Sequence, residues 1–264
     1  MGSWKTIGCS VPGTSHVLAE KPCEDALNYT IVAALNPVMI GCVCDGAGSA
    51  QFGGFAAALC SGYILKALTK VAREEHEINE EVIYEILECA YDALVTEAEL
   101  QEVELNEYSC TVLGCYITAD RALFFQIGDG AIVRSDQSGY YLPVWMPQNG
   151  EYQNSTSFLI DDKSFSNLRI SIVDEKIDEV ALFTDGLQLL ALNMEAENVH
   201  QPFFAPLFKY LRLADDGDKI AVLQRKLAEY LDSAQINDRT DDDKTLFLAT
   251  RQVTLQQGNA GILH

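Results

Sequence analysis

Five short acidic motifs, each at the end of an apolar segment, constrain this chain more than any other feature. They are Glu24-Asp25, Asp45-Gly46, Gly128-Asp129-Gly130, Thr184-Asp185-Gly186 and Asp241-Asp242-Asp243. A carboxylate that emerges from a buried strand is destabilising unless it is paired or bound to a metal ion. Glycine beside the carboxylate allows a sharp turn and exposes the backbone carbonyl as a hard oxygen ligand.

The apolar pattern between these motifs predicts an α+β fold with antiparallel sheets. Hairpin-like runs of strands alternate with helices, whereas regular strand-helix-strand units would indicate a parallel sheet. We expect helices at 51–73, 80–104, 186–192, 203–213 and 218–234. We expect strands at 4–11, 28–35, 38–44, 109–118, 122–127, 130–135, 140–142, 168–173, 179–183 and 245–250.

No repeat, low-complexity tract or linker divides the chain, so we expect a single domain over residues 1–250. A long irregular insertion at about 143–167 and a C-terminal tail at 251–264 complete it. The insertion carries Trp145, Met146 and Tyr152, which either cap the core or form a binding face. Long irregular connections are usually functional, so substrate choice is expected to depend on this insertion.

The charge and cysteine content exclude several classes of function. A formal charge of −21, from 39 acidic and 18 basic residues, disfavours nucleic acid and anionic membranes as partners. No apolar run approaches the roughly 18 residues of a membrane span. The eight cysteines lack zinc-ligand spacing and are expected to be reduced thiols in a cytoplasmic protein, which we expect to be a monomer.

The acidic motifs point to metal chemistry rather than to a covalent mechanism. A single Asp-Gly pair is most often only a turn, so the inference depends on the whole set. Oxygen ligands without histidine favour magnesium, manganese or calcium over zinc or copper. The four histidines stand in no motif with serine or cysteine, and the Cys-x5-Arg pattern of a cysteine phosphatase is absent.

Taken in order, the motifs resemble those of the metal-dependent protein phosphatases of type 2C, in particular the bacterial members. The matching segments are EDA at 24–26, VCDGAGS at 43–49, IGDG at 127–130, LFTDGL at 182–187 and DDKTLFLAT at 242–250. The resemblance extends from about Gly8 to Thr250. It implies a four-layer α/β/β/α sandwich with two central antiparallel sheets and a metal site at one end of them.

The resemblance also implies a role for each acidic position. Asp45 would bridge two Mn²⁺ or Mg²⁺ ions, one of which the Gly46 carbonyl would also bind, while Asp185 and Asp242 would complete the other. Glu24 and Asp25 would hold the cluster through water, and Asp129 would share a weaker third cation with Asp185. With Asp45, Asp185 and Asp242 as the catalytic set, a water between the cations would attack phosphoserine or phosphothreonine of a protein substrate in cytoplasmic signalling.

Three positions depart from the family pattern, one of them Ser49, which stands where a second glycine is common. Ala47 stands where many members have a histidine that serves as a candidate general acid, and Glu20 stands where many have an arginine that binds phosphate. The hypothesis is that Ser15, His16 and Lys21 take over the phosphate contact. His16 is equally compatible with a loop residue bonded to the backbone.

Two alternatives to an active protein phosphatase remain open from the sequence. One is a catalytically weak relative that acts as a phosphoprotein-binding or regulatory module. The other is a phosphatase of small phosphorylated molecules. Retention of Asp45, Asp129, Asp185 and Asp242 favours catalysis, because a pure binding module needs no such set of carboxylates.

Overall fold

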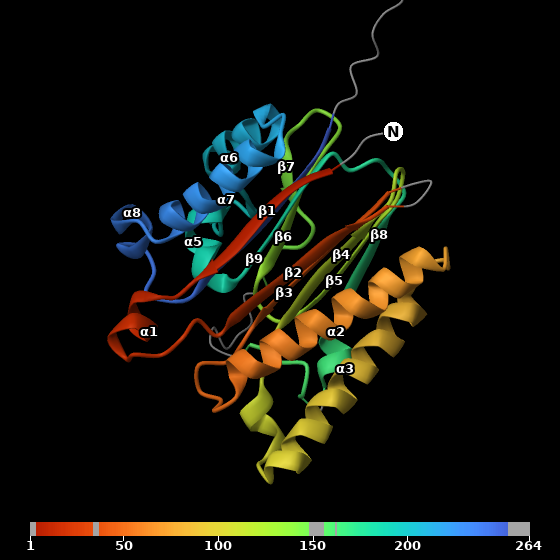
Figure 1. Ribbon diagram of the computed structural model, residues 1–264, viewed down its shortest axis with the longest axis vertical. Helices are drawn as coiled ribbons and strands as arrows, with labels where there is room; N and C mark the ends of the chain where they lie inside the picture. Colours follow the sequence, from red (N-terminus) through yellow and green to blue (C-terminus); the bar gives the residue numbers. More distant parts are fainter. Residues whose placement is uncertain (1–3, 34–36, 148–155, 162, 253–264) are drawn as a thin grey trace, which may run out of the picture.

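The computed structural model describes residues 4–33, 37–147, 156–161 and 163–252 and has four layers (Figure 1). Two five-stranded sheets face each other at the centre, and helices cover both outer faces. The predicted α+β sandwich with two antiparallel sheets is confirmed. Residues 253–264 of the expected tail and much of the expected insertion, including Tyr152, lie outside the described residues.

Every strand pair in the two large sheets is antiparallel. The first sheet has the order β1 (Trp4–Val11), β12 (Lys244–Arg251), β9 (Glu179–Phe183), β6 (Ala131–Ser135) and β7 (Tyr141–Pro143). The second has the order β2 (Asp25–Val32), β3 (Val38–Asp45), β4 (Val112–Ile117), β5 (Ala122–Ile127) and β8 (Arg169–Val173). The first and last strands of the chain therefore lie side by side.

Helices form the two outer layers. The second sheet is covered by α2 (Gly53–Arg73) and α3 (Glu80–Gln101), and the first by α6 (Gln201–Leu213) and α7 (Gly217–Leu231) (Figure 1). Short elements complete the chain: α1 (Thr14–Leu18), η1 (Leu105–Tyr108), α4 (Ser164–Asn167), η2 (Asp185–Leu187), α5 (Gln188–Ala191), β10 (Leu192–Asn193), β11 (Asn198–Val199) and α8 (Ala234–Asn237).

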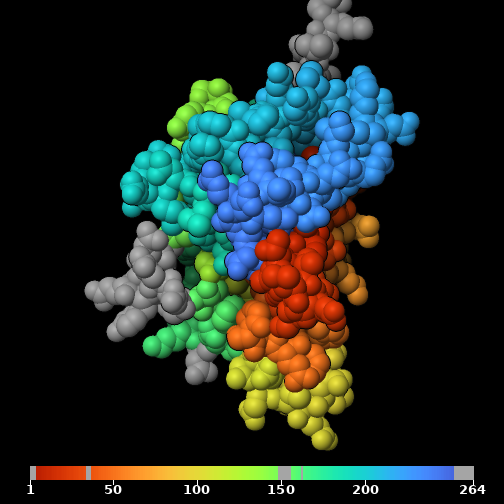
Figure 2. Space-filling model, turned by 90° about the vertical axis from the view of Figure 1, so that its left-hand side faces the viewer, coloured from red at the N-terminus to blue at the C-terminus, as the bar shows by residue number. Residues whose placement is uncertain are grey.

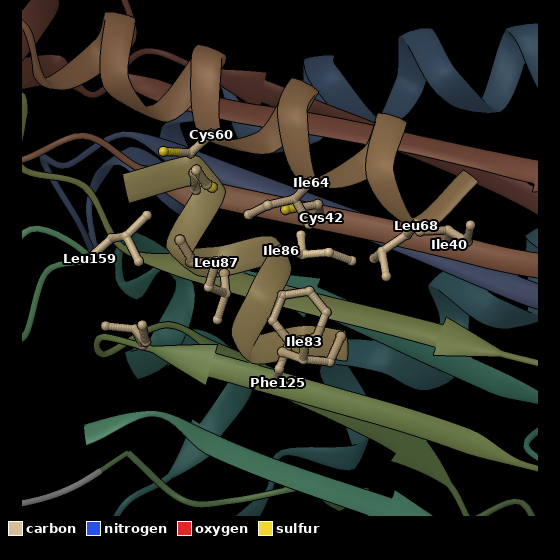
Figure 3. Close-up of a cluster of buried hydrophobic side chains, with 14 of the residues drawn as sticks. Ile40, Cys42, Cys60, Ile64, Leu68, Ile83, Ile86, Leu87, Phe125 and Leu159 are labelled. Atoms are coloured by element: carbon tan, nitrogen blue, oxygen red, sulfur yellow. The ribbon is translucent and has the colours of Figure 1, made fainter. Parts of the chain in front are cut away.

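The central strands are apolar throughout because both of their faces are buried. In β3, Ile40 and Cys42 face the helices, where they meet Ile64 and Leu68 of α2 (Figure 3). The alternate residues of β3, such as Met39, pack between the two sheets. Successive side chains of a strand point to opposite faces, so one strand contributes to two of the three core layers.

By length and composition alone, α2 is apolar enough to cross a membrane, with a mean hydropathy of 1.3 over its most apolar window. Core helices of globular domains pass the same test. Ile64, Leu68 and other apolar residues of α2 pack in the cluster between the helices and the second sheet. We therefore describe α2 as a helix of the core.

The structure corrects several predicted boundaries. The strand expected at 28–35 begins at Asp25, because Asp25 pairs with Asp45 in the β2–β3 ladder. The helix expected at 80–104 ends at Gln101, where Glu102 takes a left-handed φ of 55°. Residues 188–191 form one turn where a helix was expected at 186–192, and the helix expected at 203–213 begins at Gln201. The helix expected at 218–234 ends at Leu231, so α8 is separate from α7.

The last strand, β12, extends one residue beyond the domain boundary expected at residue 250. Arg251 is the last residue of β12, pairs with Trp4 and stacks 4.4 Å above its ring. Trp145 and Met146 of the insertion are half-buried and pack against core residues. This arrangement favours the core-capping role for these two side chains.

Gly114 of β4 provides a stability test of the sheet. A Cβ at this position would lie 2.0 Å from the Phe125 ring, which belongs to its cross-strand partner. Gly114→Ala is therefore expected to lower the free energy of unfolding by about 1–3 kcal/mol, measured by urea denaturation. Gly62→Ala is the matched control, since nothing lies within 4 Å of that position on α2. It should raise the free energy of unfolding by about 0.5–1 kcal/mol, and equal effects of the two substitutions would contradict this packing.

Candidate metal centre and active site

The antiparallel order of the strands brings the acidic motifs to one end of both sheets. Asp45 is the last residue of β3, Asp25 is the first of β2, and the two are paired across the ladder. Asp129 lies in the turn between β5 and β6, and Asp185 follows β9. Asp242 comes just before β12, which runs antiparallel to β9, so its start lies beside the end of that strand.

One cavity of about 260 Å³ collects most of the predicted metal ligands. Its walls include Asp45, Gly46, Asp129, Asp185 and Asp242, which come from four separate parts of the chain. Asp45, Asp129 and Asp185 are half-buried, whereas Asp242 is exposed at the rim. Carboxylates at the ends of distant strands therefore meet at a single point of the surface.

Asp25 and Glu24 are buried and lie outside the cavity lining. Asp25 Oδ2 accepts hydrogen bonds from the Thr184 and Thr245 hydroxyls at 2.9 and 2.7 Å. Its other oxygen, Oδ1, is buried and has no hydrogen-bond partner among the described residues. Glu24 Oε2 and Asp185 Oδ1 are likewise buried and without such a partner.

Burial and mutual repulsion raise the pKa values of these carboxyls. Burial raises the pKa of Asp25 to about 7. Hydrogen bonds from the Thr245 and Thr184 hydroxyls act in the opposite direction, and the charges of Asp243 and Asp185 raise the pKa further. Burial and the charges of Asp129 and Asp242 raise the pKa of Asp185 to about 6. The pKa of Asp45 lies well above its usual range for the same two reasons, burial first and neighbouring carboxylates second.

The residues present fit divalent cations. The donor set is made of oxygen. Two of the buried atoms that lack a hydrogen-bond partner are the carboxylate oxygens Asp25 Oδ1 and Asp185 Oδ1, and a bound cation would supply the missing interaction. Among the described residues, no three acidic, histidine or cysteine side chains form a ready-made ligand shell. This arrangement suits Mg²⁺ or Mn²⁺ ions that keep several of their own waters, because Mg²⁺ commonly binds through one or two carboxylates.

The loop that carries Gly46 is held firmly against α2 and β4. A Cβ on Gly46 would lie 2.3 Å from the backbone of Gly53, so no larger residue fits there without moving the start of α2. Thr111 fixes Asp45 from the other side, since its hydroxyl accepts from the Asp45 amide at 3.0 Å. Asp45 and the Gly46 carbonyl are thereby positioned by packing before any cation binds.

Of the three residues expected to contact phosphate, only His16 lines the cavity. Its Nδ1 lies 2.9 Å from Asp243 Oδ2 and its Nε2 lies 3.6 Å from Glu24 Oε2. Ser15 is exposed and donates its hydroxyl to the Asp241 carbonyl at 2.6 Å. Lys21 is also exposed, with Nζ 3.7 Å from Glu24 Oε1. Neither Ser15 nor Lys21 belongs to the cavity wall.

Asp243 is a residue of the site that the sequence motifs did not single out from its neighbours. It is 3% exposed and accepts hydrogen bonds from the backbone amides of Gly13 and Glu24, at 2.7 and 2.5 Å. These bonds tie the start of β12 to the β1–α1 turn and to the first acidic motif. Asp243 is buried and its neighbour Asp242 is exposed. This alternation of side-chain direction before β12 is all that distinguishes the two residues.

Asp129 is held by two polar contacts from other segments. The Thr156 hydroxyl donates to the Asp129 carboxylate, and the Gln188 side-chain amide donates to the Asp129 carbonyl. Thr156 belongs to the expected insertion and Gln188 begins α5. The position of Asp129 therefore depends on both segments.

The chain matches a known protein family and a known relative over most of its length. The sequence model of the family described as Protein phosphatase 2C matches residues 12–232. Serine/threonine-protein phosphatase 3 of Escherichia coli (strain K12) is 38% identical over 251 residues, covering 94% of this chain and 98% of that protein.

Solved structures share the fold at low sequence identity. Serine/threonine phosphatase Stp1 from Staphylococcus aureus matches with a TM-score of 0.60 and 13% identity, over 94% of this chain and 95% of its own. The catalytic domain of the serine/threonine protein phosphatase PstP, solved in complex with two manganese ions, matches with a TM-score of 0.59 and 13% identity. That match covers 96% of this chain and 100% of the PstP domain.

The raised carboxyl pKa values predict how pH acts on the metal-free protein. Asp25 has an ordinary pKa of 3.8 when unfolded and about 7 when folded, so the folded state binds more protons between these values. Stability that is present below about pH 4 is therefore lost as the pH rises towards 7. In EDTA, the free energy of unfolding should fall across this window, as measured by urea denaturation.

Asp25→Asn is the comparison that isolates this effect. The amide does not titrate, so the variant should lose less stability than the wild type between pH 4.5 and about 7. Addition of Mg²⁺ should stabilise the wild type most at the upper end of the window, since the cation binds only the folded state. Identical pH dependence in both proteins would contradict the account.

Proposed function

The chain belongs to the protein phosphatase 2C family, and from this membership and its carboxylate cavity we infer that it is a metal-dependent serine/threonine protein phosphatase. It is a phosphoric monoester hydrolase that depends on a divalent cation and acts on phosphorylated proteins. The observation that carries this function is the meeting of Asp45, Asp185 and Asp242 in one cavity, although they are far apart in the sequence.

The proposed cation ligands are the cavity residues. Asp45 and the Gly46 carbonyl would hold one Mn²⁺ or Mg²⁺ ion, and Asp45, Asp185 and Asp242 a second, with Asp129 and Asp185 available to a weaker third. Glu24 and Asp25, outside the cavity lining, would act through bound water. When bound, such cations activate water and neutralise charge on the phosphoryl group.

The protein side chains support direct attack by water. Ser49, Thr111 and Thr156 supply hydroxyls to the cavity wall, but the nearest partners of His16 are the carboxylates of Asp243 and Glu24. No serine–histidine pair is formed by the described cavity residues, so a covalent nucleophile of that type is not supported. The chain's own contribution is to place the cations and the phosphate.

His16 is proposed to contact the phosphate in place of the arginine that many relatives carry. His16 lines the cavity, and its Nδ1 lies 2.9 Å from the buried carboxylate of Asp243, which lines the same cavity. Ser15 and Lys21, assigned to the same role from the sequence, lie outside the cavity wall and are at most supporting residues. The cytoplasmic location, the monomeric state and the absence of nucleic-acid and membrane partners stay predictions.

Asp45→Asn tests the proposed function directly. The substitution removes the charge of the central ligand, so Mn²⁺-dependent hydrolysis of para-nitrophenyl phosphate and of a phosphothreonine peptide should fall by at least about 100-fold. Glu88→Gln on the exposed face of α3 is the matched control and should leave both activities unchanged. EDTA should abolish wild-type activity, and Mn²⁺ should restore it.

Two results of this assay would overturn the proposal. Absence of Mn²⁺-dependent turnover by the wild type on any phosphorylated substrate would favour a phosphoprotein-binding module. Full activity of Asp45→Asn would remove Asp45 from the catalytic set.

His16→Ala tests the phosphate contact. Loss of a hydrogen bond to a charged group should raise KM for the phosphopeptide by about tenfold or more. His76→Ala, which removes an exposed histidine that lies 3.5 Å from Glu74, is the control and should leave KM unchanged. Unaltered KM and kcat in His16→Ala would assign His16 to the structure of the loop alone.

A further inference from the structure

A second and larger cavity, of about 620 Å³, is lined in part by segments that follow Asp185 and precede Asp242 in the chain. It lies between α5, the β10–β11 hairpin, α6 and the α7–α8 segment. In Figure 2 the teal segment around α5 and the dark blue α8 lie side by side, on the same face as the red α1. None of the functions described above uses this cavity.

The chain connectivity places the cavity within reach of a bound peptide. Leu189 in its wall follows Asp185 by four residues, and Arg239 precedes Asp242 by three. Since a residue spans at most about 3.6 Å, these Cα atoms lie within about 14 and 11 Å of the two catalytic positions. A peptide whose phosphorylated residue occupies the metal centre can therefore place a side chain roughly three or four positions away in this cavity.

The cavity floor is apolar. Leu192, Phe203 and Ile236 form it and are nearly fully buried, at 5%, 6% and 1% exposure. Leu189 stands on the rim and is 75% exposed, an unusual position for leucine next to a catalytic segment. Contact with a second apolar side chain would remove this surface from water, which is favourable.

The rim also carries a cation that has no ionic partner. Ion pairs in the described part of the chain engage Arg121, Arg134 and Arg212, and none engages Arg239. Its guanidinium is exposed at the cavity wall, together with His200 and one carboxylate, Glu195. Arg239 therefore places a positive charge on this rim in a chain whose formal charge is −21.

We propose that this cavity is a substrate-docking subsite that binds an anionic side chain of the phosphoprotein through Arg239 and an adjacent apolar side chain on its floor. The subsite rests on the proposed phosphatase function and adds a specificity determinant to it. A guanidinium pairs well with either a carboxylate or a second phosphate, because both accept two parallel hydrogen bonds. The substrate class is thus a phosphoprotein with an acidic or doubly phosphorylated, partly apolar sequence.

The test compares kcat and KM of the wild type and Arg239→Glu on four phosphothreonine peptides. The peptides are identical except for residues three and four positions from the phosphothreonine on both sides, which are glutamate, phosphoserine, alanine or lysine. Arg239→Glu should raise KM for the glutamate and phosphoserine peptides by about five- to tenfold and lower it for the lysine peptide. The ratio of the wild-type KM values for the glutamate and phosphoserine peptides identifies which anion the subsite prefers.

Two controls separate this effect from a general loss of function. Para-nitrophenyl phosphate is too small to reach the subsite, so its Mn²⁺-dependent hydrolysis should be the same in Arg239→Glu and the wild type. Arg225→Glu, which makes the same charge change at an exposed position of α7, should leave peptide preference unaltered. Glu195→Ala should lower KM for the anionic peptides, since it removes the one carboxylate of the rim.

Equal KM changes for all four peptides, or no change for any of them, would overturn the docking proposal while leaving the phosphatase function intact. Failure of the wild type to hydrolyse para-nitrophenyl phosphate would instead overturn the proposed function.

Discussion

Repulsion between carboxylates in a poorly hydrated place is the constraint on which the rest of this structure depends. Burial raises the pKa values of Asp25, Asp45 and Asp185, and the charges of neighbouring carboxylates raise them further. Two of their oxygens are buried without a hydrogen-bond partner among the described residues. A fold that keeps such groups together is destabilised unless protons or cations compensate the charge. The same arrangement that weakens the metal-free protein near neutral pH is what makes the cavity a site for divalent cations.

The sandwich supplies the stability that this arrangement requires. Each central strand is apolar on both faces, so the two sheets and four principal helices form three continuous core layers. Antiparallel pairing then delivers the strand ends that carry the carboxylates to one edge. Asp243 closes this edge by accepting backbone hydrogen bonds from Gly13 and Glu24. Asp243 therefore stabilises this edge through its hydrogen bonds, while its charge adds to the repulsion among the carboxylates.

Much of the fold and the cation site could be predicted from the sequence, because both leave a local pattern. The continuous apolar run of β3 and the two long helical repeats indicated buried strands and covering helices, and acidic residues beside glycine marked the strand ends. The rest depends on tertiary contacts that leave no such pattern. Asp25 belongs to β2 because it pairs with Asp45, and Asp243 differs from Asp242 only in the direction of its side chain. The Arg239 cavity forms where α5, β10, α6, α7 and α8 meet, and this meeting of separate segments leaves no motif in the sequence.

Crystals soaked in Mn²⁺ and measured for anomalous scattering at the manganese edge test the central claim most directly. The account predicts anomalous peaks inside the cavity, next to Asp45 and the Gly46 carbonyl and between Asp45, Asp185 and Asp242. Absence of any peak there at millimolar Mn²⁺, in a protein folded as described, would contradict it.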